Sequence, residues 1–256
     1  MKISQITDIL DNYAPRFLAE EYDNVGLLIG DGERECKKVL LCLDVDEIVA
    51  EEALRLGADL IVSHHPIMFS PIKKITADTS EGRCILKLIK NDIALYSAHT
   101  NLDSTSGGLN DLICEILGLE NCVPLTNPDE EFGIGRVGEL KKEITLKELA
   151  EAVKEVFAIE SIRFSGKADK PVKRVALCSG GGSSLVFDAV ASGADVYISG
   201  DLKYNNARDL FFSGIGFIEV PHYKSEILAP KLFEKILDGY AQLYISKCNM
   251  DIFQTI

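Results

Sequence analysis

Residues 38–42 read KVLLC and residues 57–63 read GADLIVS, and these two stretches determine the fold that the sequence predicts. The first is a continuous apolar run, typical of a strand buried on both faces of a parallel sheet. Between them, residues 44–57 carry apolar side chains at helical spacing and end on Gly57, a common residue after a helix. The second stretch contains another strand, residues 59–62. Strand, helix and strand in this order indicate a crossover unit in a parallel sheet.

The alternation extends in both directions from this unit. Two helical stretches precede it, up to about residue 19. Residues 121–132, rich in Pro, Asn, Asp and Glu, are expected to form a connector. The remaining expected elements are helices at 83–90, 108–117 and 146–157, strands at 93–97, 133–140 and 161–164, and a loop at 167–171.

The second half of the chain repeats the first. KVLLC at 38–42 matches RVALC at 174–178, an offset of 136 positions (174 minus 38), and GADLIVS at 57–63 matches GADVYIS at 193–199 with the same offset (193 minus 57). A constant offset over a whole strand–helix–strand unit indicates an internal duplication. We therefore predict an α/β protein of two duplicated halves, 1–125 and 126–256. Each has a largely parallel or mixed sheet flanked by helices in three layers, and the C-terminal segment is free to pack back on the first half.

The third strand of each half leads to a histidine followed by an acid. His99 precedes Asp103 by four residues, and His222 precedes Glu226 by four residues. The offset here is 123 (222 minus 99), so the first copy has the longer loop, residues 66–82. The pattern predicts that the same His-x-x-x-carboxylate arrangement occurs at the same place in both halves.

The chain has only four histidines, His64, His65, His99 and His222, and each lies at or just past the end of a predicted strand. Ligands bind at this edge of open α/β sheets. Adjacent residues on an extended chain point to opposite sides, so two neighbouring metal ions can each take one of His64 and His65. Pro66 favours an extended backbone at His65.

Asp103 and Glu226 supply the acidic donors beside these imidazoles. Three imidazoles and two carboxylates can hold two divalent ions, roughly 3.5–4 Å apart in two-metal hydrolytic sites. This donor set suits Zn, Fe, Mn or Ni better than Mg. The set contains no cysteine, so a structural zinc site is disfavoured. Taken singly, each histidine is more often a surface or satisfied core residue, and the metal hypothesis depends on their shared sheet edge. The site is expected between the two halves.

Three further motifs have two readings each. The glycines at 180–182 form either a phosphate cradle before a helix or a tight strand-to-helix turn. Asp201 either faces the cleft, where SGD replaces the SHHP of the first copy, or caps the following helix. Residues 22–26, YDNVG, form an acidic-amide turn that is either architectural or catalytic, and the sequence alone favours the architectural interpretation.

Composition restricts the possible functions. The 256 residues are 46% hydrophobic, and a formal net charge of -13 disfavours binding to nucleic acid or anionic lipid. There is no signal-peptide pattern and no apolar run of membrane-spanning length. Seven cysteines, an odd number without a C-x-x-C pair, are typical of a reducing compartment, so a cytoplasmic location is expected.

The ordered motifs YDNVGL (22–27), SHHP (63–66), AHTNLD (98–103), SGD (199–201) and HYKSE (222–226) resemble the NIF-three family of dinuclear-metal hexamers, often labelled GTP cyclohydrolase I type 2 homologues. The resemblance covers nearly the whole chain. It differs where Tyr22 stands for the usual Trp and Pro221 for the usual Gly. It implies a toroidal homohexamer whose two divalent ions are bound by the ligands His64, His65, Asp103, His222 and Glu226.

The resemblance and the donor set together predict a metal-dependent hydrolase of a small substrate such as a purine nucleotide. His99, or Asp201, is the candidate proton relay. The alternative is a non-enzymatic regulatory or chaperone-like ring that uses the same ligands to bind metal. A nucleic-acid clamp is disfavoured by the charge.

Overall fold

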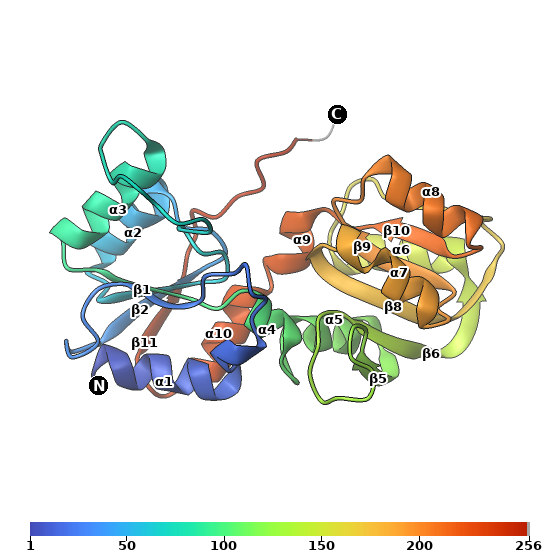
Figure 1. Cartoon of the computed structure of the whole chain (residues 1–256), viewed down its shortest axis with the longest axis horizontal. Coiled ribbons are helices and arrows are strands. Elements are labelled where there is room, and N and C mark those ends of the chain that lie inside the picture. The colour runs from blue at the N-terminus through green and yellow to red at the C-terminus, as the bar shows by residue number, and fades with distance from the viewer. Residues whose placement is uncertain (255–256) are drawn as a thin grey trace. The chain divides into compact units, whose positions relative to one another are not determined.

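The computed structural model describes residues 1–254 of the chain, which form two compact units (Figure 1). Unit 1 comprises Met1–Leu102 and Leu228–Met250, and unit 2 comprises Asp103–Ile227 with the described residues from Asp251 on. Within residues 1–254, no helix has the length and apolar character needed to cross a bilayer.

Unit 1 is built on a five-stranded sheet in the order β1-β4-β3-β2-β11. Strands β4, β3, β2 and β11 are parallel, and β1 is antiparallel to β4. The elements are α1 (Ile3–Tyr13), η1 (Arg16–Leu18), β1 (Gly26–Ile29), β2 (Lys38–Cys42), α2 (Glu47–Leu56), β3 (Leu60–Ser63), α3 (Ser80–Lys90), β4 (Ala94–Ser97), α4 (Thr100–Ser104, which continues into unit 2), α10 (Ala229–Leu237) and β11 (Gln242–Ile245).

Helices cover both faces of this sheet, with α2 and α3 on one side and α1 and α10 on the other (Figure 1). Leu40 and Ile61 pack with Val49 of α2 and Ile85 of α3 in one core cluster. Successive side chains of a strand alternate between faces, so the equally buried Leu41 points to the α1/α10 layer. The predicted three-layer α/β architecture is confirmed, and the run KVLLC is apolar throughout because both of its faces are covered.

Local signals explain the crossover from β2 to β3. The Asp46 side chain accepts hydrogen bonds from the backbone N–H groups of Ile48 and Val49, so it caps α2. The helix ends at Gly57, whose φ of 64° is left-handed. The predicted helix and the strand after it are therefore both present, with the helix starting three residues later than expected.

Unit 2 is built on a six-stranded mixed sheet in the order β5-β6-β8-β9-β10-β7. Strands β8, β9 and β10 are parallel to one another, and β5, β6 and β7 pair antiparallel. The elements are α5 (Leu109–Leu117), β5 (Leu119–Pro124), β6 (Arg136–Thr145), α6 (Leu146–Val156), β7 (Arg163–Ser165), β8 (Pro171–Gly181), η2 (Ser183–Leu185), α7 (Val186–Ala191), β9 (Val196–Gly200), α8 (Tyr204–Phe212), β10 (Gly216–Glu219) and α9 (His222–Glu226).

The helices of unit 2 also form two layers, α5 and α6 on one face of the sheet and α7 and α8 on the other (Figure 1). Ala176, Tyr197 and Phe217 of the three parallel strands share a buried cluster with Ala189 of α7 and Leu210 of α8. Unit 2 thus repeats the layered arrangement of unit 1 around its own core.

The boundary between the units differs from the one expected at 125/126. The chain passes from unit 1 to unit 2 at Leu102–Asp103, because α5 and β5 belong to the second core. Strand β5, where a connector was expected, pairs with β6 from Leu119↔Leu140 to Pro124↔Arg136. The C-terminal segment Leu228–Met250 belongs to unit 1, where β11 extends the sheet beside β2.

Matched hydrogen bonds support the internal duplication. Asp59 Oδ2 accepts from the backbone N–H groups of residues 37 and 38 at 2.8 and 3.0 Å. Asp195 Oδ2, 136 positions later (195 minus 59), accepts from those of residues 173 and 174 at 2.9 and 2.8 Å. The repeated Gly-Ala-Asp motif therefore has a structural reason, since each aspartate ties the start of one strand to its neighbour.

The third strand corrects the offset inferred from the histidines. The N–H of Ala94 donates to Asp59 O at 3.0 Å, and the N–H of Gly216 donates to Asp195 O at 2.9 Å, so β4 and β10 correspond at an offset of 122 (216 minus 94). Helices α4 and α9 begin at Thr100 and His222, again 122 apart (222 minus 100). His222 therefore corresponds to Thr100.

The prediction that the His-x-x-x-carboxylate pattern occupies the same positions in both halves is therefore wrong. His99 and His222 differ by one residue in register, and so do Asp103 and Glu226. One residue turns a helix by about 100°, so the two acids leave their helices in different directions. The two copies supply donors of similar chemistry from different positions.

The aspartate pair leads to a stability prediction. We expect Asp59→Ala and Asp195→Ala each to lower the free energy of unfolding by about 1–3 kcal/mol, because two backbone N–H groups lose their acceptor. Asp59→Asn keeps one side-chain oxygen and should cost less. Chemical denaturation measures the change, with the exposed Asp129→Ala as control. An Asp59→Ala effect no larger than that of the control would contradict the role.

Candidate metal centre

Three of the four histidines meet at the strand ends of unit 1. His64 and His65 follow β3 and His99 follows β4, and these parallel strands pair at Ser63↔Ser97. One ligand atom from each of the three rings lies within 4.8 Å of the others. The ring centroids of His64 and His99 are 5.1 Å apart, and those of His65 and His99 are 5.4 Å apart. The expectation that the sheet edge gathers these imidazoles is confirmed within unit 1.

Each of these rings is held through Nδ1 by an oxygen atom. His64 Nδ1 lies 2.9 Å from the carbonyl oxygen of Ala98, His65 Nδ1 lies 2.7 Å from Asp44 Oδ1, and His99 Nδ1 lies 3.0 Å from Asp23 Oδ1. Carbonyl and carboxylate oxygens accept, so Nδ1 carries the proton in these contacts and Nε2 of the neutral ring carries the lone pair. Metal-binding histidines use the same arrangement, in which the second nitrogen donates to a carboxylate or carbonyl.

Asp23 belongs to the turn at residues 22–24, and its carboxylate lies at the centre of this part of the site. Besides His99, it accepts from the backbone N–H of Thr100 at 3.0 Å. Burial alone would raise the pKa of Asp23, but the hydrogen bonds from His99 and Thr100 outweigh it and hold the pKa well below its usual range. Asp23 therefore stays ionised near neutral pH and orients His99. The turn, interpreted as architectural from the sequence, has a direct role in the site.

In unit 2, His222 and Glu226 lie one helical turn apart on α9. His222 Nε2 is 2.8 Å from Glu226 Oε2, and the glutamate is only 3% exposed. On the other side of the ring, Asp201 Oδ2 accepts from Nδ1 at 2.7 Å. Asp201 has a φ of 53°, a left-handed conformation that is costly for a residue other than glycine. It orients His222 and does not cap α8, whose N-cap is Lys203.

Asp103, the other predicted acidic ligand, is buried near the same part of unit 2. The Ser179 hydroxyl donates to Asp103 Oδ1 at 3.1 Å, and the neighbouring Gly180 lies against Glu226. Both carboxylates raise the pKa of the buried Cys178 thiol, after the larger effect of its burial, so both are close to this residue. Asp103, His222 and Glu226 are therefore brought together in unit 2.

The glycines at 180–182 make room for these side chains. A Cβ atom on Gly180, which has a φ of 59°, would lie 2.0 Å from Glu226 Oε1 and 3.2 Å from His222 Nε2. The N–H of Gly180 donates to Ser225 Oγ at 2.9 Å, and that of Gly182 donates to Ser199 Oγ at 3.0 Å. With these amides engaged inside the protein, the structure favours the tight turn over the phosphate cradle.

The predicted ligands are thus divided between the units, His64 and His65 in unit 1 and the other three in unit 2. Sequence reasoning missed the anchoring roles of three carboxylates, those of Asp23, Asp44 and Asp201. Asp44 stands two residues past β2 and Asp201 directly after β9, so their strand-end positions were the available signal. Asp23 follows no strand, and its role depends on a contact 76 residues away in the chain.

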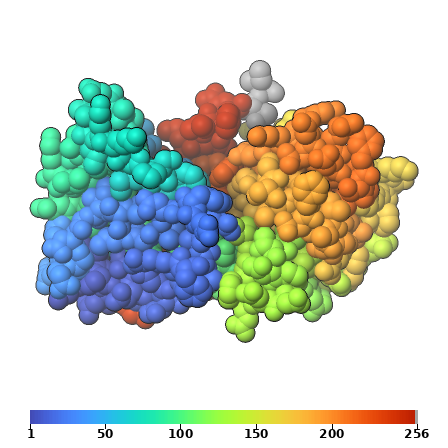
Figure 2. Space-filling model, viewed as in Figure 1, coloured from blue at the N-terminus to red at the C-terminus, as the bar shows by residue number. Residues whose placement is uncertain are grey.

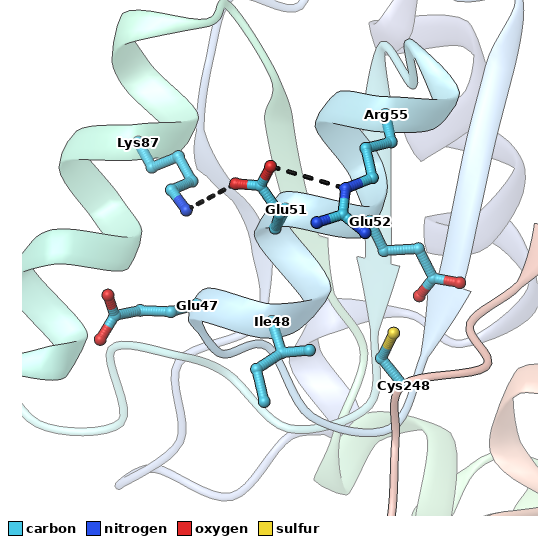
Figure 3. A pocket seen from close by; sticks show the side chains of 7 residues that line it. All are labelled: Glu47, Ile48, Glu51, Glu52, Arg55, Lys87 and Cys248. Atoms are coloured by element: carbon cyan, nitrogen blue, oxygen red, sulfur yellow. Dashed lines mark hydrogen bonds and ion pairs between the residues drawn. The ribbon is translucent and has the colours of Figure 1, made fainter.

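A pocket between α2 and α3 of unit 1 has a different character (Figure 3). Both of its cations face one carboxylate, since Glu51 lies 2.9 Å from Lys87 Nζ and 3.6 Å from Arg55 Nε. Ion pairs of this exposed kind contribute little stability. The lining residues are Glu47, Ile48, Glu51, Glu52, Arg55, Lys87 and Cys248.

The fold and the donor sets define an α/β protein with imidazole and carboxylate groups at its strand ends. Residues 1–253 match the family described as Duf34/NIF3 (NGG1p interacting factor 3). The chain belongs to this family, and the resemblance seen in the sequence motifs is confirmed.

Known proteins are similar to this chain over nearly its whole length, in sequence and in structure. A "GTP cyclohydrolase 1 type 2 homolog" of Clostridium perfringens is 41% identical over 262 residues, covering 100% of both proteins. Among solved structures, a Bacillus cereus protein related to NIF3 has a TM-score of 0.89 at 28% identity, covering 100% of this chain and 99% of that one. Reduced HcgD from Methanocaldococcus jannaschii has a TM-score of 0.83 at 33% identity, covering 96% and 97%.

The glycine turn yields a second prediction. We expect Gly180→Ala to destabilise the protein more than Gly193→Ala, because both have a left-handed φ but no atom lies within 4 Å of a Cβ at Gly193. Gly193→Ala should cost about 1–2 kcal/mol from backbone conformation alone. Thermal unfolding compares the two variants. Equal losses would mean that the Glu226 carboxylate does not require a glycine beside it.

Proposed function

We propose that this chain is a dinuclear metal-binding protein and a metal-dependent hydrolase of a small substrate. The ligands proposed are His64, His65, Asp103, His222 and Glu226. Imidazole nitrogen with carboxylate oxygen suits Zn, Fe, Mn or Ni. The ions are expected to number two per chain, as in other hydrolytic sites where a carboxylate bridges neighbouring metals.

The observation that carries the proposal is the anchoring of all four histidines through Nδ1. Three of them, His65, His99 and His222, are held by carboxylates, at 2.7, 3.0 and 2.7 Å. Core histidines need only one satisfied contact, whereas here all four rings are oriented through the same nitrogen, Nδ1. On the opposite side of its ring, His222 Nε2 lies 2.8 Å from Glu226, another of the proposed ligands. This regularity favours metal binding over four unrelated structural roles.

Covalent connectivity supports a single centre with donors from both units. Asp103 directly follows Leu102, where the chain leaves unit 1, and Glu226 lies two residues before Leu228, where the chain returns. His99 directly precedes α4, and Asp103 is the fourth residue of that helix. The donors of unit 2 thus stand next to the two points at which the chain passes between the units. We propose that they bind the same pair of ions as His64 and His65.

Bound divalent ions would supply Lewis acidity and make hydroxide accessible near neutral pH. His99 is the candidate proton relay, since its ring is oriented by Asp23 and remains 17% exposed. Because Asp23 accepts from Nδ1, Nε2 is the ring nitrogen that would take up a proton and return it. Asp201, which is occupied in orienting His222, is the weaker candidate for this role.

The name of the Clostridium perfringens relative suggests a purine nucleotide as substrate. A nucleotide offers both an electrophilic ring carbon and phosphoryl groups to a hydrolytic site. We propose a small substrate of this kind, of which GTP is the first to assay.

Metal analysis and turnover of the same variants test the proposal. We expect about two transition-metal ions per wild-type chain, and their loss together with hydrolytic activity in His65→Ala. Asp44→Ala should weaken metal affinity by roughly 10- to 100-fold, because the ring of His65 loses its anchor. Elemental analysis and chelator competition measure binding, with the exposed Asp8→Ala as control.

Two results would count against the proposal in different ways. Turnover that persists after His65→Ala has removed the metal would exclude metal-dependent hydrolysis. Stoichiometric metal without turnover of GTP, other nucleotides or small amides would favour the non-enzymatic metal-binding ring.

We also propose a cytoplasmic homohexamer, as the family resemblance implies. Large aromatic side chains exposed on α7 and α8 support a protein contact, since Phe187 and Phe212 are each 72% exposed. Light scattering coupled to gel filtration should give six times the chain mass of 28.1 kDa. A monomeric mass at micromolar concentration would rule out the hexamer.

A further inference from the structure

Two aromatic side chains lie exposed next to the histidines of unit 1. Tyr22 is 62% exposed and Phe69 is 47% exposed. Their ring centroids are 6.0 Å apart with planes tilted by 54°. Phe69 in turn lies 6.1 Å from His99, edge to face at 76°. A continuous path of rings therefore leads from the candidate metal ligands to the surface of unit 1.

The aromatic pair is held in place by the same turn that orients His99. Asn24 Nδ2 donates to Met68 O at 2.6 Å, so residue 24 fixes the backbone just before Phe69. Between Tyr22 and Asn24, Asp23 binds His99. Three consecutive residues therefore position this part of the site: Tyr22 supplies one aromatic ring, Asp23 orients His99, and Asn24 holds the loop that carries Phe69.

The loop that carries Phe69 is held on unit 1 by aliphatic side chains that pack against the core. Residues 66–79 lie largely on the surface of unit 1, in the cyan part of Figure 2. Ile67, Met68 and Ile72 pack against the core cluster under α2 and α3, while Phe69 between them stays exposed. The loop buries its aliphatic side chains and leaves its one aromatic ring in solvent beside the site, which is the reverse of what core packing alone would select.

We propose that Tyr22 and Phe69 bind the planar heteroaromatic ring of the substrate by stacking. This inference rests on the proposed function and extends it by assigning the part of the site that recognises the substrate. Aromatic side chains bind nucleobases through their faces with little dependence on sequence or charge. The neighbouring exposed carboxylates of Glu20 and Glu21 repel an anionic group, so the neutral ring of a nucleotide fits this position and its phosphates do not.

Three probes separate the ring from the phosphates. Guanosine has the ring alone, tripolyphosphate has the anionic chain alone, and GTP has both. Their affinities for the metal-loaded full chain are measured by calorimetry, and the metal content of every sample is determined in parallel. The variants are Tyr22→Leu and Phe69→Leu, with Tyr22→Phe to keep the ring and Tyr240→Leu as control for an exposed aromatic residue of unit 1, 48% exposed.

We expect Tyr22→Leu and Phe69→Leu to weaken guanosine and GTP binding by about 5- to 150-fold, the range for loss of one base–aromatic stack. Tripolyphosphate affinity and metal content should not change, and Tyr22→Phe and Tyr240→Leu should behave as wild type. The inference is overturned if guanosine does not bind the wild-type protein, or if the leucine variants bind all three probes as the wild type does. It is also overturned if the leucine variants lose affinity for tripolyphosphate by the same factor as for guanosine. Normal metal content in those cases leaves the proposed metal centre standing, whereas a wild-type chain without metal would refute that centre independently of the ring.

Discussion

The hydrogen bond from Nδ1 of each histidine to an oxygen atom is the constraint on which the site depends. A free imidazole exchanges its proton between two nitrogens and rotates about two bonds, so it presents no fixed donor. Here a carbonyl holds His64 and carboxylates hold His65, His99 and His222. The fold positions the three carboxylates. Asp44 follows strand β2, Asp201 follows strand β9, and Asp23 lies in a short turn before β1.

The duplicated scaffold has been used differently in its two copies. At the offset of 136, His65 corresponds to Asp201 and His64 corresponds to Gly200. The first copy places candidate ligands at the end of its middle strand, while the second places there the carboxylate that orients His222. A Cβ on Gly200 would lie 2.7 Å from the carbonyl oxygens of Gly180 and Val220, so no histidine fits at that position. The two copies therefore share their strands, but the residues after the middle strand have different roles: candidate metal ligands in the first copy and a histidine-orienting carboxylate in the second.

Much of the fold was predictable because buried parallel strands have a continuous apolar pattern. Residues 38–42 and 174–178 carry that pattern, and the sequence also indicated the candidate ligands through their strand-end positions. The two edge strands of unit 1 were missed for a physical reason: β1 and β11 are only partly buried, so their sequences lack a distinctive pattern. The one-residue shift between His99 and His222 was invisible because helix starts are set by backbone hydrogen bonds. Asp23 was undervalued because its partner is distant in the chain.

The discontinuity of unit 1 has a consequence for how the chain is made. Unit 2 is almost wholly one continuous segment, Asp103–Ile227, whereas the sheet of unit 1 needs β11, which follows that segment in the chain, beside β2. On a ribosome, domains fold as they emerge. The segment that is translated second is therefore the first able to close its core, and the sheet of unit 1 keeps an open edge at β2 until residues 242–245 have been synthesised. An exposed apolar edge of this kind is a pairing hazard, so nascent chains stalled before residue 242 are the form of this protein most in need of a chaperone.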